Sequence, residues 1–274
     1  MRRAHIANAF IAVVMFSLVY ANYQYYVIPS RFLQSVGAAS QLRQGADISH
    51  LYTFHIDIAA ESPGSANTYL PRYEPMDEST AERLFAAFGI TGNIIETDEV
   101  FFASDDYAMI TVYKFDRTLR YMPYFQFGSP CRSIIDHTKA EELAREFISQ
   151  RAIYTPHHKI EADFDGTNFQ LTFVNRLGGL KNYSFNTHIH MDSYGRVLEF
   201  VYSDMTFERL STHSIIPMQQ AATLLPPDID GHVHITSAVL VYAFANSIVQ
   251  PAYLFRGHFY NGAPFREFVP AAQF

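Results

Sequence analysis

The sequence predicts an α+β protein, in which an N-terminal transmembrane helix is followed by modules that each consist of a helix packed on an antiparallel sheet. Three observations lead to this prediction. Residues 4–30 contain no charged side chain. Capped amphipathic helices then alternate with runs of short strands, and this order recurs three times. Hydrophobic residues make up 49% of the 274 residues and aromatic residues 15%, which is enough for a sizeable packed core.

The uncharged stretch is expected to form a transmembrane helix over residues 5–28, with a cytoplasmic tail at 1–4 and the C-terminal part outside the cell. Arg2 and Arg3 supply the basic cluster that stays in the cytoplasm. The alternative is a cleaved signal peptide, because Ala21 is a small residue at a cleavage position. A retained helix presents small or polar residues at four-residue spacing, which form a candidate interface with a partner helix: Ala4, Asn8 and Ala12.

A stalk over residues 29–47 joins this helix to an N-terminal α+β module over 48–130. The helix of this module is expected to begin at Asp77 and to end at Gly89, a residue suited to a helix C-terminus. A β-hairpin is expected over 99–115, because two runs of strand-forming residues flank a turn-forming Ser-Asp-Asp sequence.

Two further modules, 131–212 and 213–274, repeat the order of a helix followed by strands. The helix at 139–150 is the clearest, because Thr138 and Glu141 form a capping box and apolar residues follow at helical spacing. The last helix is expected at 217–225, where two prolines end it. Strands are expected at 169–175, 183–192, 197–202, 234–244, 252–258 and 265–269.

These segments resemble the duplicated PepSY-like extracytoplasmic domains of the YycI/YycH family. The resemblance rests on the helix 139–150 and on four stretches: "HMDSYGRVLEFVYS", "PMQQAATLLP", "ITSAVLVYAF" and "QPAYLFRGHFYNGAPFREFVPAA". It covers residues 138–274 well and the N-terminal third only in outline. Spore-germination proteins of the YpeB type share the same order of elements.

The resemblance implies a non-enzymatic, membrane-anchored, extracytoplasmic regulator that binds the sensor histidine kinase of a two-component system for cell-wall homeostasis. It also implies a paralogous accessory membrane protein as a partner, and it supplies no catalytic residue. Two other functions stay open: a PepSY-type inhibitor or chaperone of a secreted peptidase or cell-wall lytic enzyme, and an exported metal-dependent hydrolase. A net charge of −7 with only four lysines argues against nucleic-acid binding.

Two His-x-His pairs raise the question of a metal site. Each pair, His188/His190 and His232/His234, places both imidazoles on one side of a strand. A zinc site needs three or four converging ligands and this spacing supplies two, so both pairs are interpreted as histidines on a solvent-facing side. We therefore expect no catalytic residue, no cofactor and no metal. In the first pair's strand, Ser184, Asn186 and Asp192 are expected to face water with the histidines, and Tyr183, Phe185, Ile189 and Met191 are expected on the buried side.

Other reactive side chains are interpreted as structural. The single cysteine, Cys131, has no intramolecular disulfide partner and no nearby base. Glu161, Asp163 and Asp165 alternate along a strand edge that is expected to face water. Two aromatic clusters leave core packing and an exposed protein-binding patch as open alternatives: Tyr121, Tyr124, Phe125 and Phe127, and then Tyr253, Phe255, Phe259 and Tyr260.

Overall fold

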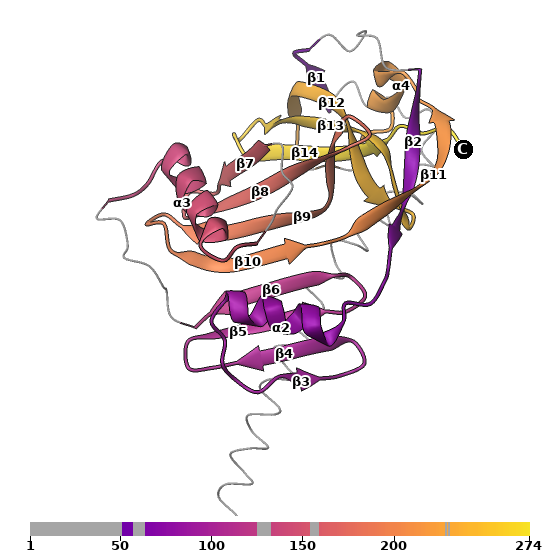
Figure 1. Cartoon of the computed structure of the whole chain (residues 1–274). Coiled ribbons are helices and arrows are strands. Elements are labelled where there is room, and N and C mark those ends of the chain that lie inside the picture. Colours follow the sequence, from indigo (N-terminus) through magenta and orange to yellow (C-terminus); the bar gives the residue numbers. More distant parts are fainter. Residues whose placement is uncertain (1–50, 57–63, 125–132, 154–158, 228, 230) are drawn as a thin grey trace, which may run out of the picture.

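The computed structural model describes residues 51–56, 64–124, 133–153, 159–227, 229 and 231–274. Strands make up 54% of it and helices 14%. The 14 strands of these ranges belong to one mixed sheet (Figure 1). The predicted modules, each a helix packed on its own antiparallel sheet, are therefore wrong, because strands from all parts of the described chain join a single sheet.

The chain up to residue 177 contributes two helices and eight strands. These are β1 (Tyr52–Phe54), β2 (Ser65–Arg72), α2 (Glu78–Ala87), β3 (Ile95–Glu96), β4 (Val100–Ser104), β5 (Ala108–Tyr113), β6 (Thr118–Pro123), α3 (His137–Ser149), β7 (Lys159–Phe164) and β8 (Asn168–Leu177). The rest of the chain contributes β9 (Leu180–Asp192), β10 (Val197–Ser203), β11 (Thr206–Ser214), α4 (Met218–Ala222), β12 (Val233–Ala245), β13 (Ile248–Phe259) and β14 (Pro264–Pro270).

The sheet is built by pairings between segments far apart in sequence. Its main path runs β11-β2-β13-β12-β9-β10-β6-β5-β4-β3, with β1 beside β12, β14 beside β13 and β7-β8 beside β9. Most neighbours are antiparallel, but β1 and β9 each pair with β12 in parallel. Each pairing satisfies backbone groups at a strand edge that separate modules would leave open. Side-chain alternation identifies a strand but not its partner, and this is why the sequence did not predict one sheet.

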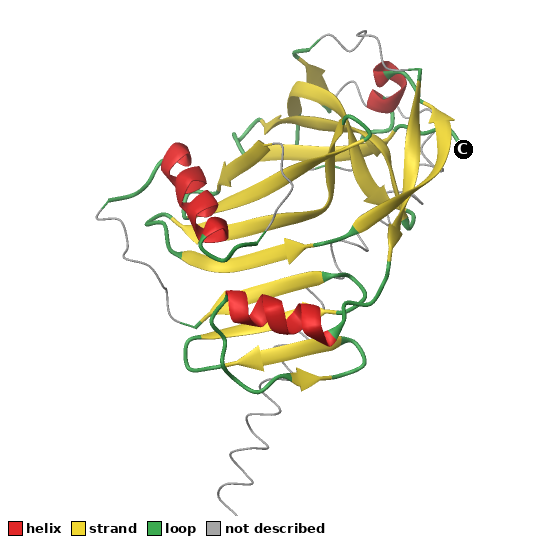
Figure 2. Cartoon of the chain, in the orientation of Figure 1, coloured by secondary structure: helices red, strands yellow, loops and turns green. Residues whose placement is uncertain are grey.

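Two helices lie over the sheet and share its larger core (Figure 2). Phe85 of α2 and Ala144 of α3 are buried in one cluster with Ile110 of β5 and Leu171 of β8. A second cluster lies under α4 and joins Tyr52 of β1 to strands β12, β13 and β14. Burial of apolar surface on these helix faces is the main force that holds them on the sheet.

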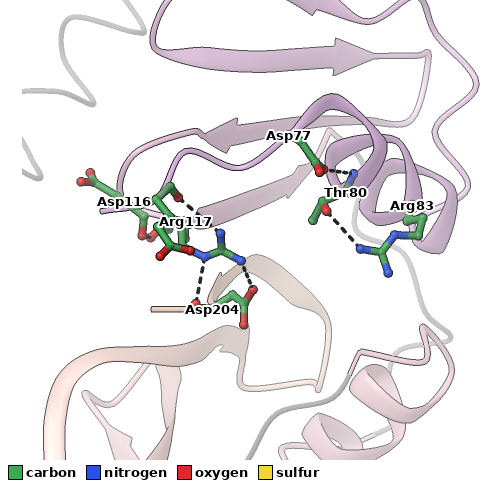
Figure 3. Close-up of polar contacts among 8 residues, drawn as sticks. Asp77, Thr80, Arg83, Asp116, Arg117 and Asp204 are labelled. Carbon is green, nitrogen blue, oxygen red and sulfur yellow. Dashed lines mark hydrogen bonds and ion pairs between the residues drawn. The ribbon is translucent and has the colours of Figure 1, made fainter. Parts of the chain in front are cut away.

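Aspartate side chains begin the two longer helices. Asp77 accepts a hydrogen bond from the backbone N–H of Thr80 at 2.8 Å (Figure 3), and Asp136 accepts one from that of Lys139 at 2.8 Å. The carboxylates satisfy N–H groups that have no partner within the helix. The N-cap of the second of these helices is therefore Asp136, two residues before Thr138, where the capping box was expected.

Arg117 joins the β5–β6 hairpin to the loop after β10. Its Nη2 lies 2.6 Å from Oδ2 of Asp204, and its Nε donates to the Asp204 carbonyl oxygen at 3.1 Å (Figure 3). Nη1 also donates to the carbonyl oxygen of Glu74 at 3.3 Å. One guanidinium thus holds three segments together, which its planar fork of donors permits.

The helices within the described ranges are all too short or too polar to cross a bilayer. The transmembrane segment expected at 5–28, its face of Ala4, Asn8 and Ala12, and the stalk at 29–47 lie outside the described residues. Cys131, Phe125 and Phe127 also lie outside them, so the predictions for these residues stay predictions.

Candidate functional site

Three turns that carry exposed aromatic side chains lie at one end of the sheet. The β4–β5 turn is beside the end of β6, where the Tyr124 backbone N–H donates to the Tyr107 carbonyl oxygen at 2.8 Å. Because β6 and β10 are antiparallel neighbours, the β9–β10 turn lies at this same end of the sheet. The β7–β8 turn also lies at this end, because the Ser193 N–H donates to the carbonyl oxygen of Thr167 in that turn at 3.1 Å.

These turns and the chain that enters α3 expose five apolar side chains, each at least 39% exposed. We name this surface the turn end; its members are Tyr107, Tyr124, Ile134, Phe164 and Tyr194. Ile134 is placed there because the next residue, Ile135, donates its backbone N–H to the Ser193 carbonyl oxygen at 2.9 Å. Apolar side chains that gather on one exposed surface, rather than lying singly, are typical of a protein-binding site.

An aspartate fixes each of the three turns in the same way. Oδ1 of Asp105 accepts the Tyr107 and Ala108 N–H groups at 2.8 and 3.0 Å. Oδ1 of Asp165 accepts two N–H groups at 2.8 Å each, and Oδ1 of Asp192 accepts two at 3.0 and 2.9 Å. The backbone bonds to Asn168 and Thr167 lower the pKa of Asp165. These hydrogen bonds restrain the backbone of each turn, which reduces the conformational entropy that the turn loses when a partner binds.

The sequence pointed to only one member of the turn end. Tyr124 belongs to the first aromatic cluster and is exposed, whereas Tyr121 of the same cluster is buried. In the second cluster Tyr253 and Phe255 are core residues, and Tyr260 is exposed on a different turn. A repeated Asp-x-Tyr pattern, present at 105–107 and at 192–194, could have identified two further tyrosines.

The expected solvent face of β9 is wrong in part. Ser184, Asn186 and Asp192 are buried, whereas Ile189 and Met191 are buried as expected. Phe185, whose φ of 51° lies in the left-handed region, breaks the regular alternation of the strand, and this accounts for the burial of Ser184 and Asn186. Burial, followed by the neighbouring charge of His190, lowers the pKa of His188 to about 4. His190 forms an ion pair with Glu199, with Nδ1 3.2 Å from Oε2.

The expected solvent-facing position of Glu161 is also wrong. Its carboxylate accepts hydrogen bonds from Lys181 at 2.9 Å, from the Tyr183 hydroxyl at 2.8 Å and from Arg256. Burial alone would raise the pKa of Glu161, but these bonds outweigh it and lower the pKa to about 2. Burial and the bond to Glu161 raise the pKa of Tyr183 to about 12. This group of charges ties β7 and β9 to β13.

The second His-x-His pair has two further histidines beside it. His55, which follows β1, and His258 of β13 lie on either side of His234 of β12. The centroid of the His234 ring lies 5.3 Å from that of His55, 5.4 Å from that of His258 and 5.1 Å from that of His232. We name these four residues the histidine cluster. Partial burial, and then the charges of the other three rings, lower the pKa of His234.

A shallow cavity of about 330 Å³ lies between β2, β11, β12 and the β8–β9 turn. Its lining is neutral, and it includes Asn67, Thr212 and Tyr242. The Thr212 hydroxyl donates to Oδ1 of Asn67 at 2.9 Å, and burial raises the pKa of Tyr242 above its ordinary value. These side chains offer hydrogen bonds to a small polar molecule but no group that titrates near neutral pH.

The fold and these surfaces define a strand-rich protein with a single mixed sheet and an exposed aromatic end. Neither the known protein families nor the curated protein sequences contain a match to this chain. Among solved structures, the C-terminal domain of YpeB from Bacillus megaterium is similar, with a TM-score of 0.45 and 15% identity over 73% of this chain and 95% of that chain. At this TM-score the likeness carries no argument about the family or the function of this chain.

Proposed function

We propose that this chain is a non-enzymatic regulator that binds another protein through its turn end. The observation that carries the proposal is that five exposed apolar side chains, three of them tyrosines, lie at one end of the sheet, on the aspartate-bound turns and the chain segments beside them. Tyrosine offers a large contact area at low entropic cost and a hydroxyl for a hydrogen bond, and it is enriched at the centres of protein interfaces.

The proposed place of action is the extracytoplasmic side of the cell membrane, where the N-terminal segment holds the chain. Support comes from the sequence: Arg2 and Arg3 precede 27 uncharged residues, 4–30, and basic residues before such a segment stay in the cytoplasm. The folded part would then face outward, and its net negative charge suits a protein that stays soluble there.

The proposed partner is a two-component sensor histidine kinase that controls cell-wall homeostasis, with a paralogous accessory membrane protein in the same complex. This choice rests on the sequence resemblance to the YycI/YycH domains. An inhibitor or chaperone of a secreted peptidase or cell-wall lytic enzyme would use the same surface, so the experiment must identify the protein that is bound.

A photo-crosslinking experiment in membranes tests this proposal. A photoreactive phenylalanine analogue replaces Tyr107 or Tyr194 in the full chain, and crosslinked products are identified by mass spectrometry. We expect the kinase at both positions. The matched control carries the analogue at Tyr260, a tyrosine that is 87% exposed outside the turn end, and should not capture the kinase.

A triple variant, Tyr107→Ser, Tyr124→Ser and Tyr194→Ser, should abolish the capture and change transcription of the genes that the kinase controls. Because all three side chains are exposed, the unfolding midpoint should stay close to that of the wild type. Capture of a peptidase or lytic enzyme would favour the alternative function. Equal capture at Tyr260 and at the turn end, or normal kinase output in the triple variant, would refute the proposed contact.

A further inference from the structure

The histidine cluster brings together imidazoles from three adjacent strands on one surface of the sheet. His234 and His258 are direct cross-strand partners in the β12–β13 pair. On the other side of β12, Thr53 is the register partner of His234, so His55 lies two residues further along the same side of the parallel β1–β12 pair. Cross-strand neighbours on one face have Cβ atoms about 5 Å apart, so all four side chains can reach one point above His234.

The shortest contact within the cluster is a nitrogen–nitrogen distance close to that between two ligands of one zinc ion. Nε2 of His55 lies 3.1 Å from Nδ1 of His234. Imidazole nitrogens bind zinc at about 2.0–2.1 Å with tetrahedral geometry, which places two ligand nitrogens roughly 3.3 Å apart. The two nitrogens are therefore already separated by nearly the distance between two ligands of one zinc ion, and the rings need to turn so that both lone pairs point at that ion.

A third ligand is oriented by Thr53. Its hydroxyl lies 2.6 Å from Nε2 of His232, which is two residues before His234 on the same side of the strand. In the tautomer whose Nε2–H donates to Thr53, Nδ1 carries the lone pair of the His232 ring. A hydrogen bond to the far nitrogen is the usual way in which a protein fixes a metal-binding imidazole.

We propose that the histidine cluster binds one divalent transition-metal ion, with zinc as the first candidate. His55, His232 and His234 supply three imidazole nitrogens, and His258 or water completes the coordination. An all-imidazole set selects zinc, copper or nickel over magnesium and calcium, which require oxygen ligands. The site is independent of the turn end and of the function proposed for it.

Binding requires the imidazole rings to turn from their present stacked positions. As they stand, the side chains of the described residues bring no three histidine, cysteine or carboxylate groups into metal-binding geometry. His234 is stacked between His55 and His258, with interplanar angles of 29° and 24°. His55 and His258 are exposed, so their rings rotate without disturbing the core.

The metal would fasten β1 to the sheet. This short strand is held by three register pairs with β12 and by Tyr52, whose hydroxyl donates to the Pro226 carbonyl oxygen at 2.7 Å. A metal–histidine bond to His55 adds a link between the start of the described chain and its C-terminal third. Since an ion that binds only the folded state stabilises it, zinc should raise the unfolding temperature.

Calorimetric titration of the full chain tests the site. The protein is purified in detergent without a histidine tag, treated with a chelator, and titrated with zinc chloride. We expect saturation at one zinc ion per chain, a higher unfolding temperature with zinc, and no competition from calcium. His55→Gln and His234→Ala should each weaken zinc binding at least tenfold, and Thr53→Val should weaken it several-fold.

Two histidines outside the cluster supply matched controls. His190→Ala removes one member of the other His-x-His pair, and His137→Ala removes an exposed histidine; both should bind zinc as the wild type does. If His234→Ala fails to fold, His55→Gln still tests the site, because His55 is exposed and its replacement should not disturb folding. No saturable binding, or binding that is unchanged by His55→Gln, would overturn the proposal. A loss of equal size in His190→Ala would also overturn it.

Discussion

The guanidinium of Arg117 is bound to both the side chain and the backbone of Asp204, a residue 87 positions later in the chain. The contact is reciprocal, because the Asp204 N–H donates to the Arg117 carbonyl oxygen at 3.0 Å. Arg117 has a φ of 48°, so the turn that places it here adopts a left-handed conformation that is rare for a residue with a side chain.

A double-mutant cycle with Arg117→Ala and Asp204→Ala should show coupling on the order of 1 kcal/mol in the free energy of unfolding. Arg117→Ala should be the more destabilising single change, because it also removes the donor to the Glu74 carbonyl oxygen. Urea unfolding followed by circular dichroism measures all four proteins. Strictly additive single effects would show that the contact contributes no stability.

Glu161→Gln should lower the free energy of unfolding by about 2 kcal/mol, because Lys181 and Arg256 would lose their anionic acceptor. The side chain of Glu161 is only 10% exposed, so solvent screens the pair weakly. Asp163→Asn, two residues along the same strand, is the control and should change stability by less than about 0.5 kcal/mol. Urea denaturation at neutral pH is the measurement; equal effects of the two substitutions would contradict the assignment.

The same carboxylate makes stability depend on acid pH. Its pKa falls from 4.5 to about 2 on folding, so the stabilisation is complete above pH 4.5 and disappears as pH falls towards 2. The difference in unfolding free energy between the wild type and Glu161→Gln should therefore shrink over this interval. A difference that stays constant between pH 5 and about 2 would show that the neighbouring residues do not lower the pKa of Glu161.

Protonation of His188 should lower the free energy of unfolding on acidification, over a higher pH range than that of Glu161. Its pKa falls from 6.5 to about 4 on folding, so the unfolded chain binds the proton first and stability declines as pH drops from 6.5 to 4. Allowing for its partial exposure, the loss is on the order of 2 kcal/mol. His188→Gln should flatten this part of the stability profile, whereas His137→Gln should not. Identical slopes in both variants would disprove the role of His188.

Gly257→Ala should destabilise the sheet by about 2 kcal/mol or more, because the added methyl group meets backbone atoms. A Cβ at this position would lie 2.0 Å from the carbonyl oxygen of His234 and 2.8 Å from its carbonyl carbon. Gly64→Ala is the matched control, since a Cβ there has no atom within 4 Å. Thermal unfolding compares the two; equal midpoints would show that the strands separate here at little cost.

The sequence predicts most elements that have strong local signals. The helix Glu78–Ala87 follows the expected Asp77 and precedes Gly89, and the ends of strands β8–β10 and β12–β14 lie within four residues of the expected positions. Strands β1, β2, β3, β6 and β11 escaped prediction. β2 and β6 each contain a proline, and β11 is polar on both faces, so neighbouring strands rather than their own periodicity hold them in the sheet.

The candidate sites were less predictable because they are assembled by long-range pairing. His234 was recognised as part of a His-x-His pair, but His55 lies 179 residues away and joins it only through the parallel β1–β12 pairing. No local pattern marks that register. Likewise, Tyr107 and Tyr194 follow separate aspartate turns, and they reach the same surface only because β6 pairs with β10.

The pairing of β2 with β11 constrains how the protein is made. Thr68 bonds to Ser211, which lies 143 positions later in the chain, so β2 has no strand partner on that side until most of the chain has emerged from the ribosome. Sheets dominated by such distant pairings fold slowly. A chain truncated before β11 would expose the backbone edge of β2, and it would become a substrate for chaperones and proteases rather than a smaller working protein.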